Sequence, residues 1–152
     1  MNVVLVEPEI PANTGNIART CAATGAALHL VGPLGFSTDD KHLKRAGLDY
    51  WHLVKVFYYN GFDELYQANR QACFYFATTR AAVRYSSVSY PPDCFLVFGR
   101  ETAGLPAQIL ETFFDRLIRI PVVPGARSLN LSNAVAIVLY EALRQQGFVG
   151  LK

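Results

Sequence analysis

Three short segments of this chain combine small or polar residues with side chains that bind phosphates, hydroxyls or amides. In the first, residues 13–19 (NTGNIAR), Gly15 lies near the start of a predicted helix and Arg19 follows about one turn later. The unpaired N–H groups at a helix start bind anions, and a guanidinium binds phosphate through two parallel hydrogen bonds. The segment therefore predicts a phosphate contact, although a capped helix with a surface arginine explains it equally well.

The second segment, residues 98–106 (FGRETAGLP), follows directly after an apolar run. Its two glycines, Gly99 and Gly104, lie five positions apart and flank a charged pair. Glu101 could accept hydrogen bonds from backbone amides and hold such a loop rigid, which favours a loop folded tightly around a ligand. The alternative is a glycine-rich turn with a surface salt bridge.

The third segment, residues 128–134 (SLNLSNA), places four polar side chains at the start of the longest predicted helix. Serine and asparagine favour helix caps and are indifferent helix formers, because their side chains bond to nearby backbone groups. A single cap at Ser128 would account for the helix start but not for Asn130, Ser132 and Asn133 as well. A polar ligand, or a neighbouring loop fixed by these side chains, is the better explanation.

Other common signatures of nucleotide or nucleophile sites are absent from the sequence, including G-x-G-x-x-G, G-x-x-x-x-G-K-[ST] and G-x-S-x-G. Cys21, Cys73 and Cys94 form no C-x-x-C pair, and the three histidines have no metal-ligand spacing. We therefore expect neither a disulfide framework nor a metal site. Cys73 and Cys94 lie in apolar runs and are predicted to be core residues, with a catalytic cysteine as the alternative.

Apolar runs alternate between strand-like and helix-like patterns along the whole chain. Strands are predicted at residues 2–6, 27–31, 52–58, 73–78, 94–98 and 117–123, and helices at 13–24, 39–46, 62–71, 106–113 and 129–146. This alternation indicates an α/β fold with a mainly parallel sheet and helices on both faces, in a single domain over residues 1–152. In such sheets ligands bind beyond the carboxyl ends of the strands, which is where all three segments lie.

The chain has no run of 18 or more apolar residues and no opening signal peptide, so we expect a cytoplasmic protein without a membrane contact. The last predicted helix is apolar over more than one face. Leu131, Val135 and Val138 line one side, and Ile137 and Tyr140 extend the apolar surface further round. Burial of this helix against a second subunit is the more economical explanation for so short a chain.

The net charge of +2 is too small to identify a nucleic-acid binder by itself, but its distribution is uneven. Residues 65–92 contain no acidic side chain and include Arg70, Arg80 and Arg84. A second basic cluster consists of Lys41, Lys44 and Arg45. Both groups are either solvated surface or contacts for phosphates.

Together the three segments resemble the motifs of the SPOUT RNA 2′-O-methyltransferases, N-x-G-N-x-x-R, F-G-x-E-x-x-G-[LI] and S-L-N-[LV]-S-[NVS]-A, in the family's order and over essentially the whole chain. Residues 37–51 and the ending NAVAIVLYEALRQ are similar to the subgroup that methylates the wobble ribose, on cytidine or uridine, of leucine tRNAs. The resemblance implies a C-terminal deep trefoil knot, a homodimer, S-adenosyl-L-methionine (SAM) as cofactor, tRNA as substrate and no metal.

The resemblance also implies roles for individual residues. Catalysis would involve Arg19, assisted by Asn16 and Asn130 through hydrogen bonds to the ribose or by fixing the loops. RNA phosphates would contact Lys41, Lys44, Arg45, Arg80 and Arg84. The cofactor would be bound, mainly through the backbone, by Ala77, Thr78, Gly99, Glu101, Gly104, Leu105, Ile120, Val122, Ser128, Leu129 and Asn133.

A guanidinium is effectively always charged in proteins, so Arg19 is a poor general base. We expect it instead to hold a phosphate and orient the ribose hydroxyl. Two alternatives remain at this point. One is a SPOUT enzyme acting on ribosomal RNA or on another tRNA position, and the other is a non-enzymatic α/β module that binds RNA or a small molecule.

Overall fold

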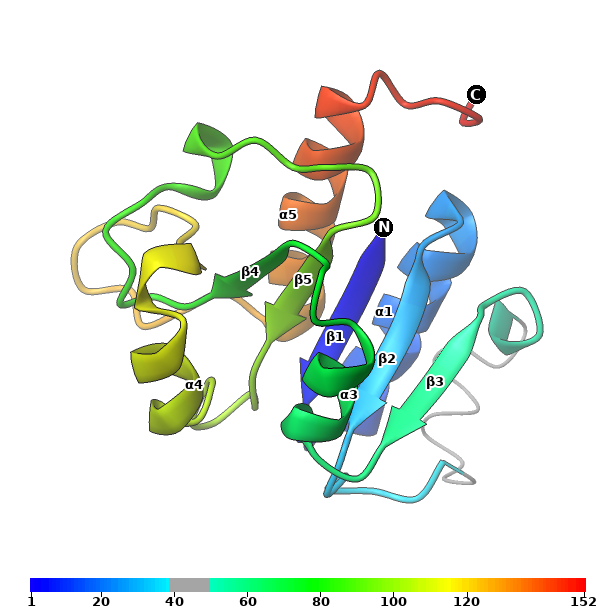
Figure 1. The fold of residues 1–152 in the computed structure, drawn as a ribbon, viewed down its shortest axis with the longest axis horizontal. Coiled ribbons are helices and arrows are strands. Elements are labelled where there is room, and N and C mark those ends of the chain that lie inside the picture. The colour runs from blue at the N-terminus through cyan, green and yellow to red at the C-terminus, as the bar shows by residue number, and fades with distance from the viewer. Residues whose placement is uncertain (39–49) are drawn as a thin grey trace.

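A six-stranded sheet forms the centre of the computed structural model, which describes residues 1–38 and 50–152 (Figure 1). The strand order is β3-β2-β1-β5-β4-β6, and every neighbouring pair is parallel. The strands are β1 (Asn2–Val6), β2 (Ala27–Val31), β3 (Val56–Tyr59), β4 (Phe74–Ala77), β5 (Phe95–Phe98) and β6 (Leu117–Ile118). The helices are α1 (Pro11–Thr24), α3 (Phe62–Ala68), α4 (Ala107–Thr112) and α5 (Leu131–Gln145), with 3₁₀ turns at Tyr85–Ser87 and Phe114–Arg116.

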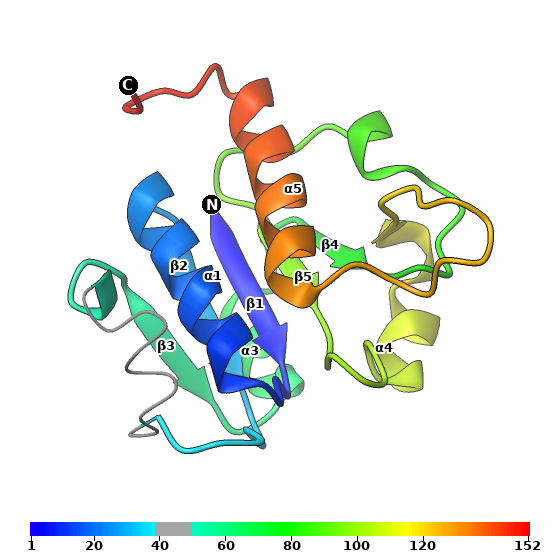
Figure 2. The same cartoon turned by 180° about the vertical axis from the view of Figure 1, so that it is seen from behind.

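The helices cover both faces of the sheet, as predicted. Helices α1 and α5 lie side by side on one face, and α3 and α4 lie on the other (Figures 1 and 2). The side chains of β1 alternate between the two faces: Val3 and Leu5 pack beneath α1 and α5, whereas Val4 and Val6 pack beneath α3 and α4. All four are at most 1% exposed. Each such burial contributes about 1.5–3 kcal/mol to folding, which explains why β1 is an uninterrupted apolar run.

The strand order places a topological switch point between β1 and β5. From β1 the chain moves outward through β2 to β3, and β5 then pairs with the opposite edge of β1. The connections that leave β1 and β5 therefore start from neighbouring strand ends and diverge. Open α/β sheets bind ligands at such a point.

Helix α1 begins two residues before its predicted start. Pro11 occupies the first turn, where its missing N–H leaves no hydrogen bond unmade, and Ile10 is the N-cap without a side-chain bond. Asn13 opens the predicted helix and has a residue type that favours helix caps, but it lies inside the first turn and its side chain bonds elsewhere, so Asn13 as the cap was wrong. Gly25 ends the helix with φ at 71°, in the left-handed region that glycine favours.

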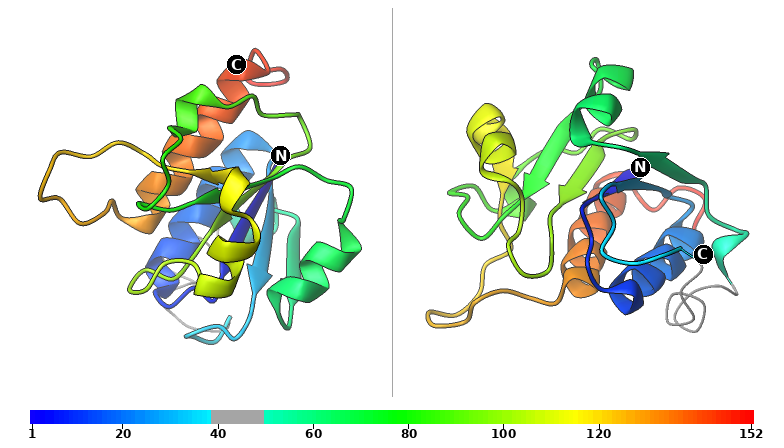
Figure 3. Two further views of the ribbon diagram at one scale, coloured as in Figure 1. Left: turned by 60° about the vertical axis from the view of Figure 1, so that its left-hand side comes forward. Right: turned by 90° about the horizontal axis from the view of Figure 1, so that it is seen from below.

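The last strand is shorter than predicted because its second half leaves the sheet. Strand β6 ends at Ile118, and residues 121–130 are all exposed. Pro121 and Pro124 cannot donate to a ladder, which removes two of the hydrogen bonds that a strand through this segment would need. Figure 3 shows the connection from β6 to α5 extending away from the sheet. Helix α5 then begins at Leu131.

Three further expectations have different outcomes. Strand β3 begins at Val56 rather than at residue 52, because the N–H groups of Leu53 and Val54 bond back to Tyr50 and Trp51 in a turn. Cys73 is exposed, so its assignment to the core was wrong, whereas Cys94 is buried. The predicted helix at residues 39–46 lies outside the described residues, and the trefoil knot stays a prediction.

Candidate active site

Glu101 joins the loop after β5 to the connection after β1. Its carboxylate accepts hydrogen bonds from the backbone N–H of Glu9 at 2.8 Å, from the N–H of Ile10 at 3.1 Å and from Asn13 Nδ2 at 3.1 Å. The sequence predicted that Glu101 would accept hydrogen bonds from backbone amides, and this is confirmed. The amides belong to the segment entering α1 and not to the loop of Glu101 itself. The carboxylate therefore fixes the two chain segments that diverge at the switch point.

The segment before α1 also supplies acceptors to the loop after β5. The carboxylate of Glu9 accepts hydrogen bonds from the N–H of Thr102 at 3.1 Å and from its hydroxyl at 2.7 Å. Arg100 forms an ion pair with Glu7. Each segment thus supplies a carboxylate that binds N–H groups of the other. The bonds to Glu101 from the Glu9 N–H and from Asn13 are partly buried and contribute most, whereas the contacts of Thr102 and Arg100 are exposed to solvent and contribute less.

Asn13 and Asn130 extend this network to the third segment. The side-chain amide of Asn13 donates to Glu101 through Nδ2 and accepts from Asn130 Nδ2 through Oδ1 at 3.0 Å. The oxygen of Asn130 caps α5, because it accepts the N–H of Ser132 at 2.9 Å and that of Asn133 at 3.4 Å. The cap of α5 is therefore Asn130 and not Ser128. Glu101, Asn13 and Asn130 form one chain of hydrogen bonds through all three segments.

The loop after β5 closes so tightly that only glycine fits at position 99. Arg100 and Gly104 exchange two backbone hydrogen bonds, of 3.1 and 3.0 Å. A Cβ on Gly99 would lie 2.1 Å from the carbonyl carbon of Gly104, a backbone atom that cannot move aside. Gly104 itself has φ at 70°, which favours glycine. The predicted tight loop is present.

A cavity of about 760 Å³ lies at this end of the sheet, between the three segments. Ten of the eleven residues expected to bind the cofactor line it: Ala77, Thr78, Gly99, Glu101, Gly104, Leu105, Ile120, Val122, Ser128 and Leu129. Asn133 does not line it. Its N–H points instead to the capping oxygen of Asn130. The size falls within the range of small-molecule sites.

The cavity wall mixes apolar side chains with polar atoms. Leu105 and Ile120 are apolar, whereas Thr78 and Ser128 offer hydroxyls, and the glycines of the loop let backbone atoms come close to a ligand. Such a wall suits a molecule with a flat heterocycle and a polar end, as SAM has. The sequence did not predict Arg127 as a residue of this site, although Arg127 lines the cavity together with Arg80.

Comparisons with known proteins identify the family of this site. A sequence model of the SpoU rRNA Methylase family matches residues 1–140. The chain belongs to the SpoU rRNA Methylase family. An Escherichia coli (strain K12) protein named tRNA (cytidine(34)-2′-O)-methyltransferase is 49% identical to it over 151 residues, which cover 99% of this chain and 96% of that protein.

Solved structures of the same kind share the fold. One, described as giving structural insights into the 2-OH methylation of C/U34 on tRNA, has a TM-score of 0.92 and 41% identity, covering 96% of this chain and 95% of that chain. The SpoU methyltransferase AviRb from Streptomyces viridochromogenes, in complex with the cofactor AdoMet, has a TM-score of 0.85 and 25% identity, covering 96% of this chain and 60% of that chain.

In this SpoU family chain, one of the three predicted catalytic residues lines the cavity and two do not. Asn130 lines the cavity, whereas Arg19 and Asn16 are exposed and do not. The guanidinium carbon of Arg19 lies 5.0 Å from the ring centroid of Tyr50, a cation–π contact that the sequence did not reveal. Arg19 lies six positions after Asn13 along α1, a rise of about 9 Å.

The predicted RNA-binding residues are divided in the same way. Arg80 lines the cavity and Arg84 is exposed on the segment that follows β4. Lys41, Lys44 and Arg45 lie outside the described residues. Of the five, Arg80 is the residue that the structure places at the cavity.

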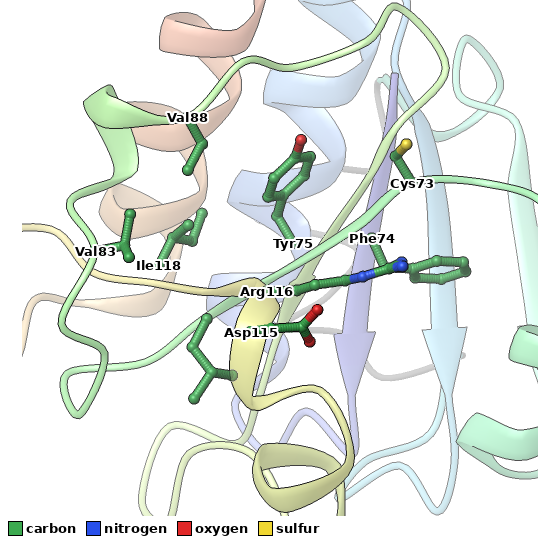
Figure 4. A pocket seen from close by; sticks show the side chains of 9 residues that line it. Cys73, Phe74, Tyr75, Val83, Val88, Asp115, Arg116 and Ile118 are labelled. Atoms are coloured by element: carbon green, nitrogen blue, oxygen red, sulfur yellow. The ribbon is translucent and has the colours of Figure 1, made fainter.

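The cysteines lie away from the cavity between the three segments. Burial raises the pKa of the Cys21 and Cys94 thiols to about 12, so both are un-ionised and poor nucleophiles at neutral pH. The exposed Cys73 lies at a second cavity, of about 350 Å³, beside Tyr75 and Arg116 (Figure 4). Within residues 1–38 and 50–152 no three His, Cys, Asp or Glu side chains are arranged to hold a metal, and no helix is long and apolar enough to cross a membrane.

Proposed function

We propose that this protein transfers a methyl group from SAM to the ribose 2′-oxygen of the wobble nucleotide, cytidine or uridine 34, of leucine tRNAs. The observation that supports this most directly is the Glu101–Asn13–Asn130 network, which assembles three separate segments around a cavity of about 760 Å³. The names of the Escherichia coli relative and of the structure concerned with C/U34 point to the same reaction.

SAM would occupy this cavity and, when bound, supply a methyl group on a positively charged sulfur. The backbone of the loop from Gly99 to Leu105 would lie against the cofactor, with Ile120 as an apolar contact and Thr78 and Ser128 as hydrogen-bonding partners. Asn130 would act through the loops, because both ends of its amide are already engaged by Asn13 and by the start of α5. The cavity wall would thus hold the donor mainly through the loop backbone, the hydroxyls and the apolar contact.

Arg19 would hold the phosphate next to the target ribose and so orient the 2′-hydroxyl. In the reaction the 2′-oxygen forms a bond to the methyl carbon while the bond from that carbon to sulfur breaks. The hydroxyl proton passes to solvent or to a phosphate oxygen, because a charged guanidinium cannot accept it. Holding the hydroxyl in line with the donor supplies much of the rate in such a transfer.

The position of Arg19 supports a homodimer as the active form. Arg19 lies outside the cavity of its own chain, on a helix that packs beside α5. Tyr140 of α5 is 45% exposed and Ile10 at the start of α1 is 44% exposed, although both are large apolar residues. A dimer around α1 and α5 would cover them and would bring Arg19 towards the cavity of the partner subunit. We expect the enzyme to be cytoplasmic, where its tRNA substrate is found.

The test is methyl transfer from labelled SAM to unmodified tRNA, with the wild type beside Arg19→Ala and Arg19→Lys, followed by nuclease mapping of the label. We expect label on the 2′-oxygen of nucleotide 34 of leucine tRNAs and loss of it in Arg19→Ala. Arg19→Lys at near-full activity would refute the two-bond hold on phosphate. Label at another position, or on ribosomal RNA, would refute the wobble assignment and keep the enzyme class.

A further inference from the structure

Two segments without acidic residues pair with each other at one edge of the sheet. Residues 65–92 and residues 116–140 contain no Asp or Glu. The structure brings them together through the pairing of β4 with β6, the outermost strand. The pairing continues beyond both strands, since the N–H of Arg119 bonds to Val83 at 2.9 Å and the N–H of Tyr85 bonds to Arg119 at 2.8 Å.

This extension places two arginines directly opposite each other. Arg84 and Arg119 are partners in a parallel β-bridge, and both are exposed. Side chains of bridge partners leave the ladder on the same face, and like charges in this position destabilise a sheet. The two ion pairs found within the described residues, Arg100–Glu7 and Arg144–Glu141, involve neither arginine. The fold thus keeps a like-charged pair that no described carboxylate neutralises.

The same edge leads to the cavity. Arg80 precedes Arg84 by four residues and Arg127 follows Arg119 by eight, and both Arg80 and Arg127 line the cavity wall. Glu101 also lines it, but its carboxylate is already bonded to two backbone N–H groups and to Asn13. Arginines therefore lie both at the paired edge and at the cavity wall, and Ile120, the residue after Arg119, also lines the cavity.

We propose that Arg84 and Arg119, continued by Arg80 and Arg127, form a track for the RNA backbone that binds successive phosphates next to the target nucleotide. The proposal rests on the proposed function and extends it to Arg119 and Arg127. Backbone phosphates are repeated negative charges, and binding them relieves the repulsion between the paired arginines. The simpler explanation is that charges at an edge strand prevent sheets from joining. A single charged residue would be enough to keep sheets from joining. Edge protection also does not explain why Arg80 and Arg127 line the cavity.

The experiment measures how tRNA binding depends on salt for Arg84→Gln, Arg119→Gln and the double variant. Arg70→Gln is the matched control, because Arg70 is exposed and belongs to the same acid-free segment but lies just after α3. Each lost phosphate contact lowers the slope of log affinity against log salt by about 0.7–0.9. For the double variant the affinity difference from wild type should shrink about 7- to 12-fold between 50 and 200 mM salt. SAM affinity and the unfolding temperature should not fall.

A double variant with the salt slope of Arg70→Gln would overturn the proposal. Aggregation of the double variant with unchanged RNA affinity would also overturn the proposal, because that is the result expected from edge protection alone. Should the double variant fold poorly, each single variant carries the same test at half the change in slope. If the wild type methylates tRNA and the slopes do not change, the track fails and the proposed function stands. If the slopes change but no RNA is methylated, the phosphate track stands and the proposed function fails.

Discussion

Replacing Glu101 by glutamine tests whether the three segments depend on one carboxylate. Glu101→Gln keeps the size of the side chain but leaves only one acceptor oxygen. The new NH₂ group must face either the N–H of Glu9, which lies 2.8 Å from the carboxylate, or the two donors at 3.1 Å. At least one hydrogen bond is replaced by two donors facing each other, and the remaining bonds lose their ionic partner. At about 1.5–3 kcal/mol for a bond to a charged group, and for a half-buried site, we expect a loss of roughly 2–4 kcal/mol.

The measurement is thermal and urea unfolding at one protein concentration, together with calorimetric titration of SAM. For a domain of this size 1 kcal/mol corresponds to about 2–4 °C, so the unfolding temperature should fall by roughly 4–16 °C. SAM binding should weaken about tenfold or more, because the loop that forms the cavity wall is no longer held against α1. Glu111→Gln is the control: Glu111 is exposed on α4, and its side chain makes no hydrogen bond within the described residues.

The reasoning is refuted if Glu101→Gln matches Glu111→Gln in both stability and SAM affinity. A loss of stability with unchanged SAM affinity would refute only the second half, namely that the anchored loop is what the cofactor binds. A loss of SAM affinity with unchanged stability would mean that Glu101 contacts the ligand directly and does not act through α1.

Three other substitutions test separate parts of the structure. Gly99→Ala should destabilise the protein by about 1–3 kcal/mol or more in urea unfolding, because its Cβ would lie 2.1 Å from a backbone carbon. Gly61→Ala, whose Cβ would have nothing within 4 Å, should cost only the weaker N-cap of α3, about 1 kcal/mol or less. Burial lowers the pKa of His29 to about 4, so the folded state holds it neutral while the unfolded state binds a proton below about 6.5. The free energy of unfolding should therefore fall by about 2 kcal/mol from pH 7.5 to pH 5, and His29→Gln should lack this fall. An equal fall in the variant would mean that other titrating groups cause the pH dependence. Tyr50→Leu should lower the rate of methyl transfer about 2- to 5-fold while Tyr50→Phe keeps it, because a ring is what contacts Arg19, and equal rates for the two variants would contradict this.

The sequence predicts the fold and the positions of the three segments because both depend on local patterns. Apolar runs such as residues 2–6 and 27–31 specify buried parallel strands, and strand ends in such a sheet share one edge. The boundaries that moved did so for equally local reasons, as at Pro121, where the backbone cannot continue a ladder. Cys73 was misplaced because an apolar neighbourhood in sequence does not fix which face of a strand end is covered.

The contacts inside the site could not be predicted in the same way. Asn13 has the residue type of a helix cap, yet its side chain bonds to Glu101 and Asn130, which are 88 and 117 residues away. No periodicity encodes a contact over that separation. The distance of Arg19 from its own cavity is likewise a property of the direction of α1, and the opposition of Arg84 and Arg119 depends on the register of a ladder beyond the strands.

The chemistry of Asn13 explains why these segments act as a unit. The NH₂ of its side-chain amide donates to the carboxylate of Glu101, and the oxygen of the same amide accepts from Asn130, so the residue must be donor and acceptor at once. An aspartate offers no donor and would add a negative charge beside Glu101, and a leucine of similar size would remove the bond to Glu101 and the bond from Asn130. Asn13 is only 6% exposed, so water cannot easily replace either bond. A shift of α1 would therefore break contacts to the loop after β5 and to the start of α5 together. Because Arg19 lies on the same rigid helix, the cavity and the arginine are held at one fixed spacing.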